Sequence, residues 1–526
     1  MSLWEEASTG TIRRLRFHLA APGCVPLPPK KLQAVPAQKR TIAMFVAKLL
    51  IDNEASDALD AATFECIDPA TGDVATIAPA ASVADAARAA SAAAAAFPAW
   101  SQAGPGERRI CLNKAADILT ARRADFVTAM VGETGATALW AAINCDLAAD
   151  ILREAAAMTT QVSGEIIPSS EQGSLAMAVR QPAGVCLGIA PWNAPIILGV
   201  RSIAMPLACG NTVILKASEL CPRTHCLIGE VMRDAGFPAG VVNVITNAPK
   251  DAAAIVETLI AHPAVRRINF TGSTRVGRLI AEVSARHLKR CLLELGGKAP
   301  FIVLADADID EAVRAAAFGA FMNQGQICMS TERIILMEAI ADEFVEKFKT
   351  KAQTLVAGNP RDGNTPLGTM ITTEAARRVR ALVEDATQKG AVIVCGGQAR
   401  GTLIDATIID QVTPAMRIYR EESFGPLAAI IRVESIDEAI TVANDNEYGL
   451  SSAVFSRDIN QALIVAKRIE TGICHINEAT VADEPQMPFG GVKSSGYGRF
   501  GGKAAIDEFT ELRWITLASG RRDYPI

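Results

Sequence analysis

The sequence predicts an α/β protein built on a parallel, doubly wound sheet, with a second α/β unit following it. From residue 183 onward, short apolar stretches alternate with helix-forming stretches, as in parallel strands joined by crossover helices. The alternation restarts near residue 300 and continues to about residue 475. The length of 526 residues also exceeds what one ordinary core needs, so two or three domains are expected.

The segment before the first sheet is predicted to be helical. Residues 83–98 and 106–130 are dense in alanine and other good helix formers. The alanine run is better explained as a packed helix than as a linker.

The first sheet is predicted from four apolar strands, VCLGIA, TVILK, VVNVI and RINFT. Helical segments at residues 222–236, 250–261 and 274–286 separate or follow them. A helix near 308–324 opens the second unit. Ligands of such sheets bind beyond the carboxyl ends of the strands, so functional residues are expected there.

Two segments fall outside this alternation. The turn-rich, polar stretch 163–182 interrupts the first unit, and the final stretch EFTELRWITLAS can supply a strand. Both are suited to an extra sheet at an oligomer interface.

Residues 1–43 differ from the rest of the chain. They carry seven Lys or Arg against two Glu, with five prolines and no hydrophobic period. No apolar core of a secretory signal is present. We expect a disordered leader, or a start assigned too early with initiation near Met44; a transit peptide is a third possibility, which Glu5 and Glu6 weaken.

Composition excludes several classes of partner. Half of the residues are hydrophobic, 21% are charged and the net charge is -5, so no basic surface for nucleic acid is expected. The longest uncharged apolar stretch, residues 181–200, is interrupted by prolines, so no membrane span is expected. Twelve cysteines at irregular spacing, without a CxxC pair, predict reduced thiols in a cytoplasmic protein. Cys221, His225 and Cys226 lack a second ligand pair, so no metal is expected.

The stretch FMNQGQICMS contains the first candidate catalytic residue, Cys328. A cysteine that follows a helical segment in a glycine-containing loop can have an exposed sulfur and a lowered pKa. A cysteine chosen at random is more often a small buried hydrophobe, and eleven others are present. Cys328 is distinguished only by its setting.

Two further candidates come from the ends of apolar strands. Glu294 in LELGGKAP precedes two glycines; it is either a charged turn residue or a general base with a pKa raised by burial. Asn193 in APWNAPIILG lies between two prolines, which restrict the flanking backbone. It is either a turn residue or a fixed donor to an oxyanion.

Two strand ends are suited to a dinucleotide. FTGSTRVG is a strand that leads through a glycine turn into a helix, whose first N–H groups can bind a pyrophosphate. TVILKASE places Lys216 and Glu219 where they could reach a ribose. The match of GYGRFG to GxGxxG is discounted, because no βαβ unit surrounds it.

Six motifs occur complete and in order: PWNxP, FTGSTxVG, ELGGK, FxNxGQxC, EExFGP and PFGGxKxSGxGR. In these segments the chain resembles the aldehyde dehydrogenase superfamily, from about residue 64 to residue 516. The resemblance implies an aldehyde dehydrogenase-like fold with a Rossmann-like nucleotide-binding domain, an α/β catalytic domain and a small β oligomerisation domain. The corresponding residues are 44–162 with 183–295, then 296–490, and 163–182 with 505–520. It also implies a homodimer or homotetramer.

The resemblance implies roles for individual residues. Cys328 is similar to the nucleophile that attacks the aldehyde, and Glu294 to the base that activates water for hydrolysis of the thioester. The Asn193 amide and the Cys328 N–H would hold the oxyanion. Retention of Glu294 favours hydrolysis over acyl transfer to coenzyme A. The implied cofactor-binding residues are Trp192, Lys216, Ser218, Glu219, Gly272, Ser273, Leu295, Glu422 and Phe424.

The cofactor implied by the resemblance is NAD, with NADP possible. A carboxylate at Glu219 near the ribose would accept hydrogen bonds from its hydroxyls and repel a 2′-phosphate. Some family members with this residue also accept NADP.

The resemblance implies an aldehyde substrate, and the chain is most similar to the branch that acts on aromatic aldehydes of the salicylaldehyde, vanillin and benzaldehyde type. Apolar Ile197, Ile327, Met329 and Phe489 are the expected pocket residues. The alternative is an aliphatic aldehyde or succinate semialdehyde. Arg201 keeps that alternative open, although a solvated helix face explains Arg201 at least as well.

One position departs from the family pattern. Glu478 stands after GICHIN, where a small residue, commonly glycine, is usual. If that backbone requires a positive φ, glutamate adds strain; near the substrate entrance it adds negative charge.

Overall fold

The computed structural model describes residues 44–363, 365–522 and 524–526. The expected leader, residues 1–43, lies outside the described residues. No helix in the described part of the chain is long and apolar enough to span a membrane.

The first large sheet has eight strands in the order β22-β12-β11-β8-β9-β10-β2-β3. Its five central strands are parallel, and β2, β3 and β22 join antiparallel. Strands β8, β9 and β10 are buried along their whole length, as in a sheet covered on both faces. The strands are β2 Leu49–Ile51, β3 Glu54–Ser56, β8 Val185–Ile189, β9 Thr212–Lys216, β10 Val242–Ile245, β11 Val265–Thr271, β12 Arg290–Glu294 and β22 Gly496–Tyr497.

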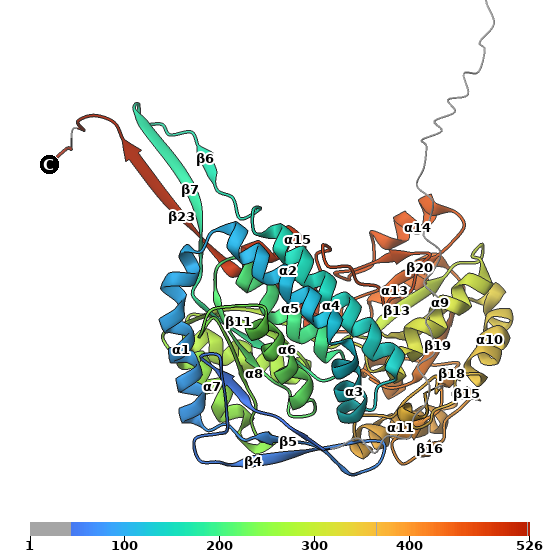
Figure 1. Cartoon of the computed structure of the whole chain (residues 1–526). Coiled ribbons are helices and arrows are strands. Elements are labelled where there is room, and N and C mark those ends of the chain that lie inside the picture. Colours follow the sequence, from blue (N-terminus) through green and yellow to red (C-terminus); the bar gives the residue numbers. More distant parts are fainter. Residues whose placement is uncertain (1–43, 364, 523) are drawn as a thin grey trace, which may run out of the picture. The chain divides into compact units, whose positions relative to one another are not determined.

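Helices cover both faces of this sheet (Figure 1). Apolar residues of α1, α7 and α8 form one core with the sheet, and those of α2 to α6 form the other. The helices are α1 Val83–Gln102, α2 Pro105–Ala121, α3 Arg123–Thr134, α4 Ala138–Met158, α5 Pro195–Ala208, α6 Pro222–Asp234, α7 Ala252–Ala261 and α8 Thr274–Arg286. The helical structure expected at 106–130 is present, as two helices that divide at Arg122, whose φ of -91° and ψ of 15° end α2.

The second large sheet has seven strands in the order β15-β18-β19-β14-β13-β20-β21. Its apolar residues pack against α9 and α10 on one face and α11 to α14 on the other. The strands are β13 Ala299–Val303, β14 Thr331–Met337, β15 Val392–Cys395, β18 Thr407–Asp410, β19 Leu427–Val433, β20 Ala453–Phe455 and β21 His475–Ile476. The helices are α9 Ile309–Phe321, α10 Glu338–Gln353, α11 Thr373–Gln388, α12 Arg417–Arg420, α13 Ile436–Asn444 and α14 Ile459–Ala466.

A third sheet joins the two segments that lay outside the alternation. Strand β7 (Ser174–Pro182) pairs antiparallel with β23 (Thr510–Ala518) along its whole length, and β6 (Glu165–Ile167) flanks β7. Figure 1 shows β7 and β23 as a long two-stranded ribbon. Helix α15 (Gly502–Phe509) leads into β23.

The remaining elements are small. Strands β1 (Phe45–Val46), β4 (Thr63–Ile67) and β5 (Val74–Pro79) form one sheet, and β16 (Ala399–Arg400) pairs with β17 (Leu403–Ile404). Four 3-10 turns among the described residues are η1 Pro249–Asp251, η2 Met322–Gly325, η3 Pro360–Asp362 and η4 Lys493–Ser495.

Candidate active site

The loop that carries Cys328 turns sharply away from α9. Three successive residues, Asn323, Gln324 and Gly325, have positive φ values of 49°, 56° and 67°. A side chain at Gly325 would place its Cβ 2.0 Å from the carbonyl oxygen of Gly425, so only glycine fits there. The loop is therefore fixed by its backbone, and it presents Cys328 to a cavity instead of to the core.

Glu294 ends β12 beside this loop. The chain then passes so close to the loop that a Cβ at Gly297 would lie 2.2 Å from the carbonyl oxygen of Cys328. The carboxylate of Glu294 is fully buried, and neither oxygen has a hydrogen-bond partner among the described residues. A buried carboxylate without partners favours its neutral form.

Burial raises the pKa of Glu294 to about 7, and the smaller influences of Cys328, Arg201 and Thr271 lower it. The pKa of the Cys328 thiol is raised, whereas the sequence suggested a lowered one. Desolvation by the cavity walls, followed by the negative charge of Glu294, raises the pKa of Cys328 well above its usual range. The expectation of a lowered pKa is wrong, because the carboxylates of Glu294 and Glu422 act on the sulfur, while Arg201, which opposes them, is paired with Asp483.

Asn193 is held in place from three sides. Its side-chain nitrogen donates a hydrogen bond to the carbonyl oxygen of Gln326 at 2.9 Å. Its backbone carbonyl oxygen accepts hydrogen bonds of 2.9 Å from the Trp140 indole N–H and from the Asn323 side-chain amide. Pro195 then begins α5. The second N–H of the Asn193 amide remains for another acceptor.

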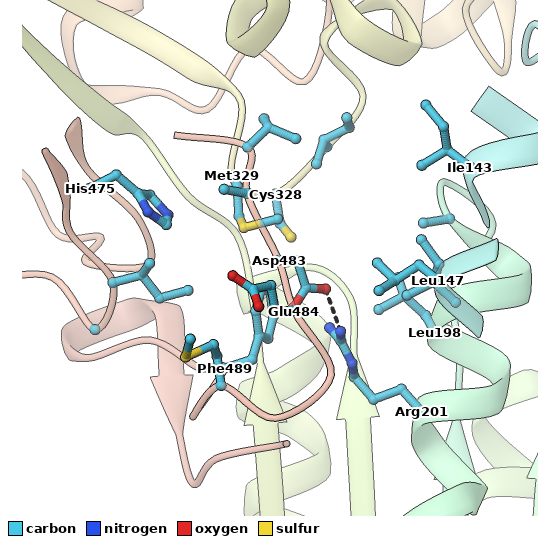
Figure 2. A pocket seen from close by; sticks show the side chains of 18 of the residues that line it. Ile143, Leu147, Leu198, Arg201, Cys328, Met329, His475, Asp483, Glu484 and Phe489 are labelled. Carbon is cyan, nitrogen blue, oxygen red and sulfur yellow. Dashed lines mark hydrogen bonds and ion pairs between the residues drawn. The ribbon is translucent and has the colours of Figure 1, made fainter. Parts of the chain in front are cut away.

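Cys328 and Asn193 border a cavity of about 710 Å³ between α4, α5, the Cys328 loop and residues 472–489. All four residues expected in the pocket line it: Ile197, Ile327, Met329 and Phe489. Figure 2 shows Cys328 facing a wall that carries Leu147 and Leu198, with Phe489 on another side. The walls near the thiol are therefore mainly apolar.

Arg201 also lines this cavity, so the explanation of Arg201 as a solvated helix face is wrong. Helix α5 is buried on every side, and Arg201 is only 6% exposed. Its guanidinium forms an ion pair with Asp483 and lies 4.4 Å from the centre of the Phe489 ring. The residue belongs to the substrate cavity.

Glu478 lies at the cavity as well, without the strain that was considered for it. The positive φ of this segment, 56°, belongs to Asn477, a residue type that tolerates it. The Asn477 side chain is fixed by two hydrogen bonds with the backbone of Ser456. Glu478 therefore adds charge to the cavity and no backbone strain.

The first group of candidate cofactor residues follows β9. Lys216 and Glu219 form an ion pair, and Glu219 also accepts a 2.9 Å hydrogen bond from Asn247. Burial opposes ionisation of Glu219, but Lys216 outweighs it and the pKa of Glu219 is lowered. Ser218 donates its backbone N–H to Nδ1 of His225. The strand end thus presents a negative carboxylate beside an ammonium group.

The second group follows β11, at the same edge of the parallel sheet. Ser273 caps the N-terminus of α8 by accepting from Val276. The ring of Phe270 leaves no room for a side chain at Gly272, where a Cβ would lie 2.4 Å away. The side chain of Leu295 likewise closes over Gly277 of α8. The N-terminus of α8, which follows a glycine without a side chain, is suited to bind a phosphate.

The third group adjoins the nucleophile loop. Glu422 accepts a 2.9 Å hydrogen bond from the N–H of Gly297, and burial raises its pKa to about 7. Phe424, with a φ of 46°, meets Trp192 edge-on with 5.8 Å between ring centroids. The Lys216–Glu219 ion pair, the glycine turn before α8 and the aromatic pair of Trp192 and Phe424 together offer donors and acceptors that fit a nicotinamide dinucleotide.

Several residues of the site were not identified from the sequence. Trp140 lines the cavity and holds Asn193. Glu332 accepts hydrogen bonds from the backbone of Ser423 and Phe424 and pairs with buried Lys298. Lys298 stands in the motif LELGGKAP, which could have drawn attention to it, whereas Glu332 and Trp140 have no local signal.

Among the described residues, no three His, Cys, Asp or Glu side chains are grouped to hold a metal ion. His225 instead accepts a hydrogen bond at Nδ1, and Nε2 lies 3.1 Å from the carbonyl oxygen of Pro195. These contacts fix α6 against α5.

Comparison with known proteins places the chain in a family. The pattern of the aldehyde dehydrogenase family matches residues 56–515. The chain is 59% identical to a vanillin dehydrogenase of Pseudomonas fluorescens over 92% of its own length and 100% of the relative. It is 52% identical to a salicylaldehyde dehydrogenase of Pseudomonas putida over 91% of its own length and 99% of that relative.

A solved structure agrees with these sequences. The salicylaldehyde dehydrogenase from Pseudomonas putida G7, complexed with salicylaldehyde, superposes with a TM-score of 0.90 at 50% identity. The match covers 92% of this chain and 100% of that one. The family of such enzymes uses NAD(P) to oxidise aldehydes, and the chain described here belongs to the aldehyde dehydrogenase family, in both sequence and fold.

Proposed function

We propose that this enzyme oxidises aromatic aldehydes to carboxylates with NAD, using Cys328 as the nucleophile. The observation that carries the proposal is the cavity of about 710 Å³, whose walls near the Cys328 thiol are mainly apolar. A planar ring desolvated between aliphatic side chains suits such a space. The relatives named for vanillin and salicylaldehyde support the same substrate class.

In the first half of the reaction, Glu294 accepts the proton of the Cys328 thiol, and the sulfur attacks the aldehyde carbon, so that a C–S bond forms as the C=O double bond opens. The carbonyl oxygen becomes an oxyanion and accepts hydrogen bonds from the free N–H of Asn193 and the backbone N–H of Cys328. Among the described residues, that backbone N–H donates to no protein acceptor, so it is available. A bound nicotinamide would supply the hydride acceptor, and loss of the hydride from the carbon attached to the Cys328 sulfur would restore the C=O bond and leave an acyl thioester on Cys328.

In the second half, Glu294 takes a proton from a water molecule that attacks the acyl carbon on Cys328. The C–S bond then breaks and the carboxylate leaves. A pKa of about 7 suits Glu294 to this exchange, because it can both accept and release a proton near neutral pH.

Trp192, Ser218, Gly272, Ser273, Leu295, Glu422 and Phe424 are the further residues proposed to hold the cofactor. NAD is proposed over NADP because Glu219 is ionised and would accept hydrogen bonds from both ribose hydroxyls. A 2′-phosphate would meet its negative charge. The test is kcat/KM with each cofactor for the wild type and for Glu219→Gln. The variant keeps Lys216 for the phosphate, so its NADP-to-NAD ratio should rise about ten-fold; a wild type that prefers NADP would overturn the proposal.

The substrate class is tested by NADH formation from salicylaldehyde, vanillin, benzaldehyde, hexanal and succinate semialdehyde. Aromatic substrates should lead by at least about ten-fold in kcat/KM, roughly 1.4 kcal/mol of transition-state preference. The alternative, a semialdehyde dehydrogenase with the same chemistry, has one observation in its favour, the presence of Arg201 in the cavity. If succinate semialdehyde led instead, the aromatic assignment would be wrong.

We also propose that the enzyme is a homodimer or homotetramer that assembles through the sheet of β6, β7 and β23. This sheet exposes large apolar side chains, namely Ile166, Ile167, Leu175, Leu512, Trp514 and Leu517. Exposed apolar residues at this density are typical of surfaces that another chain covers.

A further inference from the structure

The substrate cavity contains one Lys or Arg side chain and three carboxylates among its described lining residues. The cation is Arg201 on α5, and the carboxylates, Glu478, Asp483 and Glu484, lie on the segment after β21. A substrate that carries a carboxylate would need a free cation in this cavity, since burying an unpaired charge is costly.

Arg201 is already committed to Asp483. Their side chains are only 7% and 10% exposed, and Figure 2 shows the ion pair within the cavity. Within the described residues, the pair with Asp483 is the only hydrogen bond of this guanidinium. The Phe489 ring covers one side of it at 4.4 Å. The cation is thus held by an internal anion and an aromatic face.

Asp483 uses only one of its two carboxylate oxygens in the pair with Arg201. Its Oδ2 accepts from Arg201, while its Oδ1 is buried with no hydrogen-bond partner among the described residues. An internal acceptor of this kind competes directly with the carboxylate of a ligand for the same guanidinium. The pair is assembled across 282 positions of sequence, so it exists only in the folded cavity.

The surroundings of the other two carboxylates offer no cation that could replace Arg201. Glu478 and Glu484 are exposed at the cavity, and Nδ1 of His475 lies 3.7 Å from the carboxylate of Glu478. Burial lowers the pKa of His475, so this imidazole is neutral at neutral pH. The cavity therefore carries an excess of negative charge.

We propose that Asp483 determines which substrate charge the enzyme accepts: by pairing with Arg201, it withholds from carboxylate-bearing aldehydes the only Lys or Arg side chain that lines the cavity among the described residues. The enzyme is thereby restricted to uncharged aldehydes, and removal of the Asp483 charge converts Arg201 into a carboxylate-binding residue. This inference rests on the proposed function of the same cavity and specifies its substrates further.

The test compares two aldehydes of nearly equal shape, 4-formylbenzoate and 4-formylbenzamide, with the wild type and Asp483→Asn. The measured quantity is the ratio of kcat/KM for the anionic substrate to that for the neutral one. In Asp483→Asn this ratio should rise at least ten-fold over the wild type, which corresponds to about 1.4 kcal/mol. Inhibition by benzoate should strengthen in parallel.

Glu484→Gln is the matched control, because it removes one negative charge from the same cavity without releasing Arg201. Its ratio should change no more than about three-fold, as expected for a partly screened charge. The double variant Asp483→Asn/Arg201→Met should lose the gain. An equal rise in Glu484→Gln and Asp483→Asn, or a gain that survives in the double variant, would overturn the proposal.

Asp483→Ser provides a second variant in case Asp483→Asn is unstable, and a thermal melt of each variant verifies folding. The proposed function and this inference fail in different ways. If the wild type prefers succinate semialdehyde to every aromatic aldehyde, the proposed function fails. If the wild type prefers neutral aromatic aldehydes while Asp483→Asn leaves the charge ratio unchanged, only this inference fails.

Discussion

The amide nitrogen of Asn193 donates a 2.9 Å hydrogen bond to the carbonyl oxygen of Gln326, two residues before Cys328. This bond fixes the side chain of one strand end against the nucleophile loop of another unit of the fold. One N–H of the amide is used for orientation, and the other is free to bind an oxyanion that forms at Cys328. The same side chain thus joins the loop and, in the proposed reaction, binds the oxyanion.

Replacement of Asn193 by Ala should reduce kcat by about 10²–10³-fold, the usual loss when one donor to an oxyanion is removed. Affinity for NAD, measured by fluorescence titration, should change little. Asn193→Asp should be at least as impaired, because a carboxylate would repel the oxyanion. A kcat within three-fold of wild type in Asn193→Ala would exclude this role.

Replacement of Cys328 by Ala should abolish turnover while NAD binding remains. The measurement is NADH formation with the substrate that is best for the wild type. Cys395→Ser is a suitable control, because Cys395 is a half-buried thiol on β15 and does not line the cavity. Appreciable activity in the alanine variant would assign the nucleophile to another residue.

The activity should depend on pH through Glu294, whose pKa of about 7 lies near the working range. The ionised carboxylate is the base, so kcat should fall as pH decreases through about 7 in the wild type. Glu294→Gln should lose most of its steady-state rate and this dependence together. If the acidic limb of the kcat profile persisted unchanged in the variant, a different group would be responsible.

The same shift predicts an effect on stability with a definite sign. The pKa of Glu294 is raised above its ordinary value of 4.5, so the folded state keeps a proton that the unfolded chain releases. The free energy of unfolding therefore falls as pH rises from about 4.5 to about 7, by roughly 3 kcal/mol at most.

Glu294→Gln removes this pH-dependent cost, although its buried amide adds a cost that does not depend on pH. The Tm of the variant relative to the wild type should therefore increase between pH 5 and pH 8. Thermal unfolding at both pH values measures the difference. A Tm difference that stays constant with pH would show that Glu294 is not buried as an ionisable group.

The five parallel strands of the first sheet could be predicted because each is a short apolar run, and the residues at or just after their ends include Asn193, Lys216 and Glu294. The antiparallel strands β2, β3 and β22 were not predicted. Parallel strands end at one edge, so pattern alone brings these candidates together. The end of α2 at Arg122 had no such signal, because residues on both sides of it favour helix equally.

The ion pair of Arg201 and Asp483 could not be predicted from the pattern. The two residues are 282 positions apart, and Arg201 stands in a helix whose burial on every side depends on tertiary packing. The raised pKa of Cys328 was missed for a similar reason. A loop motif predicts Cys328 as the nucleophile, whereas the pKa of its thiol is set by desolvation and by carboxylates that other segments contribute.

Trp514 on β23 is 79% exposed, more than a tryptophan on a solvated surface usually is. Trp514 pairs across the ribbon with Ala178, and exposed Leu512 and Leu517 lie on the same strand. If this sheet is the assembly surface, a charge at Trp514 must be desolvated on association. Trp514→Asp should therefore shift the protein to a smaller species in light scattering after size exclusion. Leu288→Asp, at a residue 94% exposed outside this sheet, should leave the mass unchanged. If Trp514→Asp kept the wild-type mass, the interface would not lie on β23.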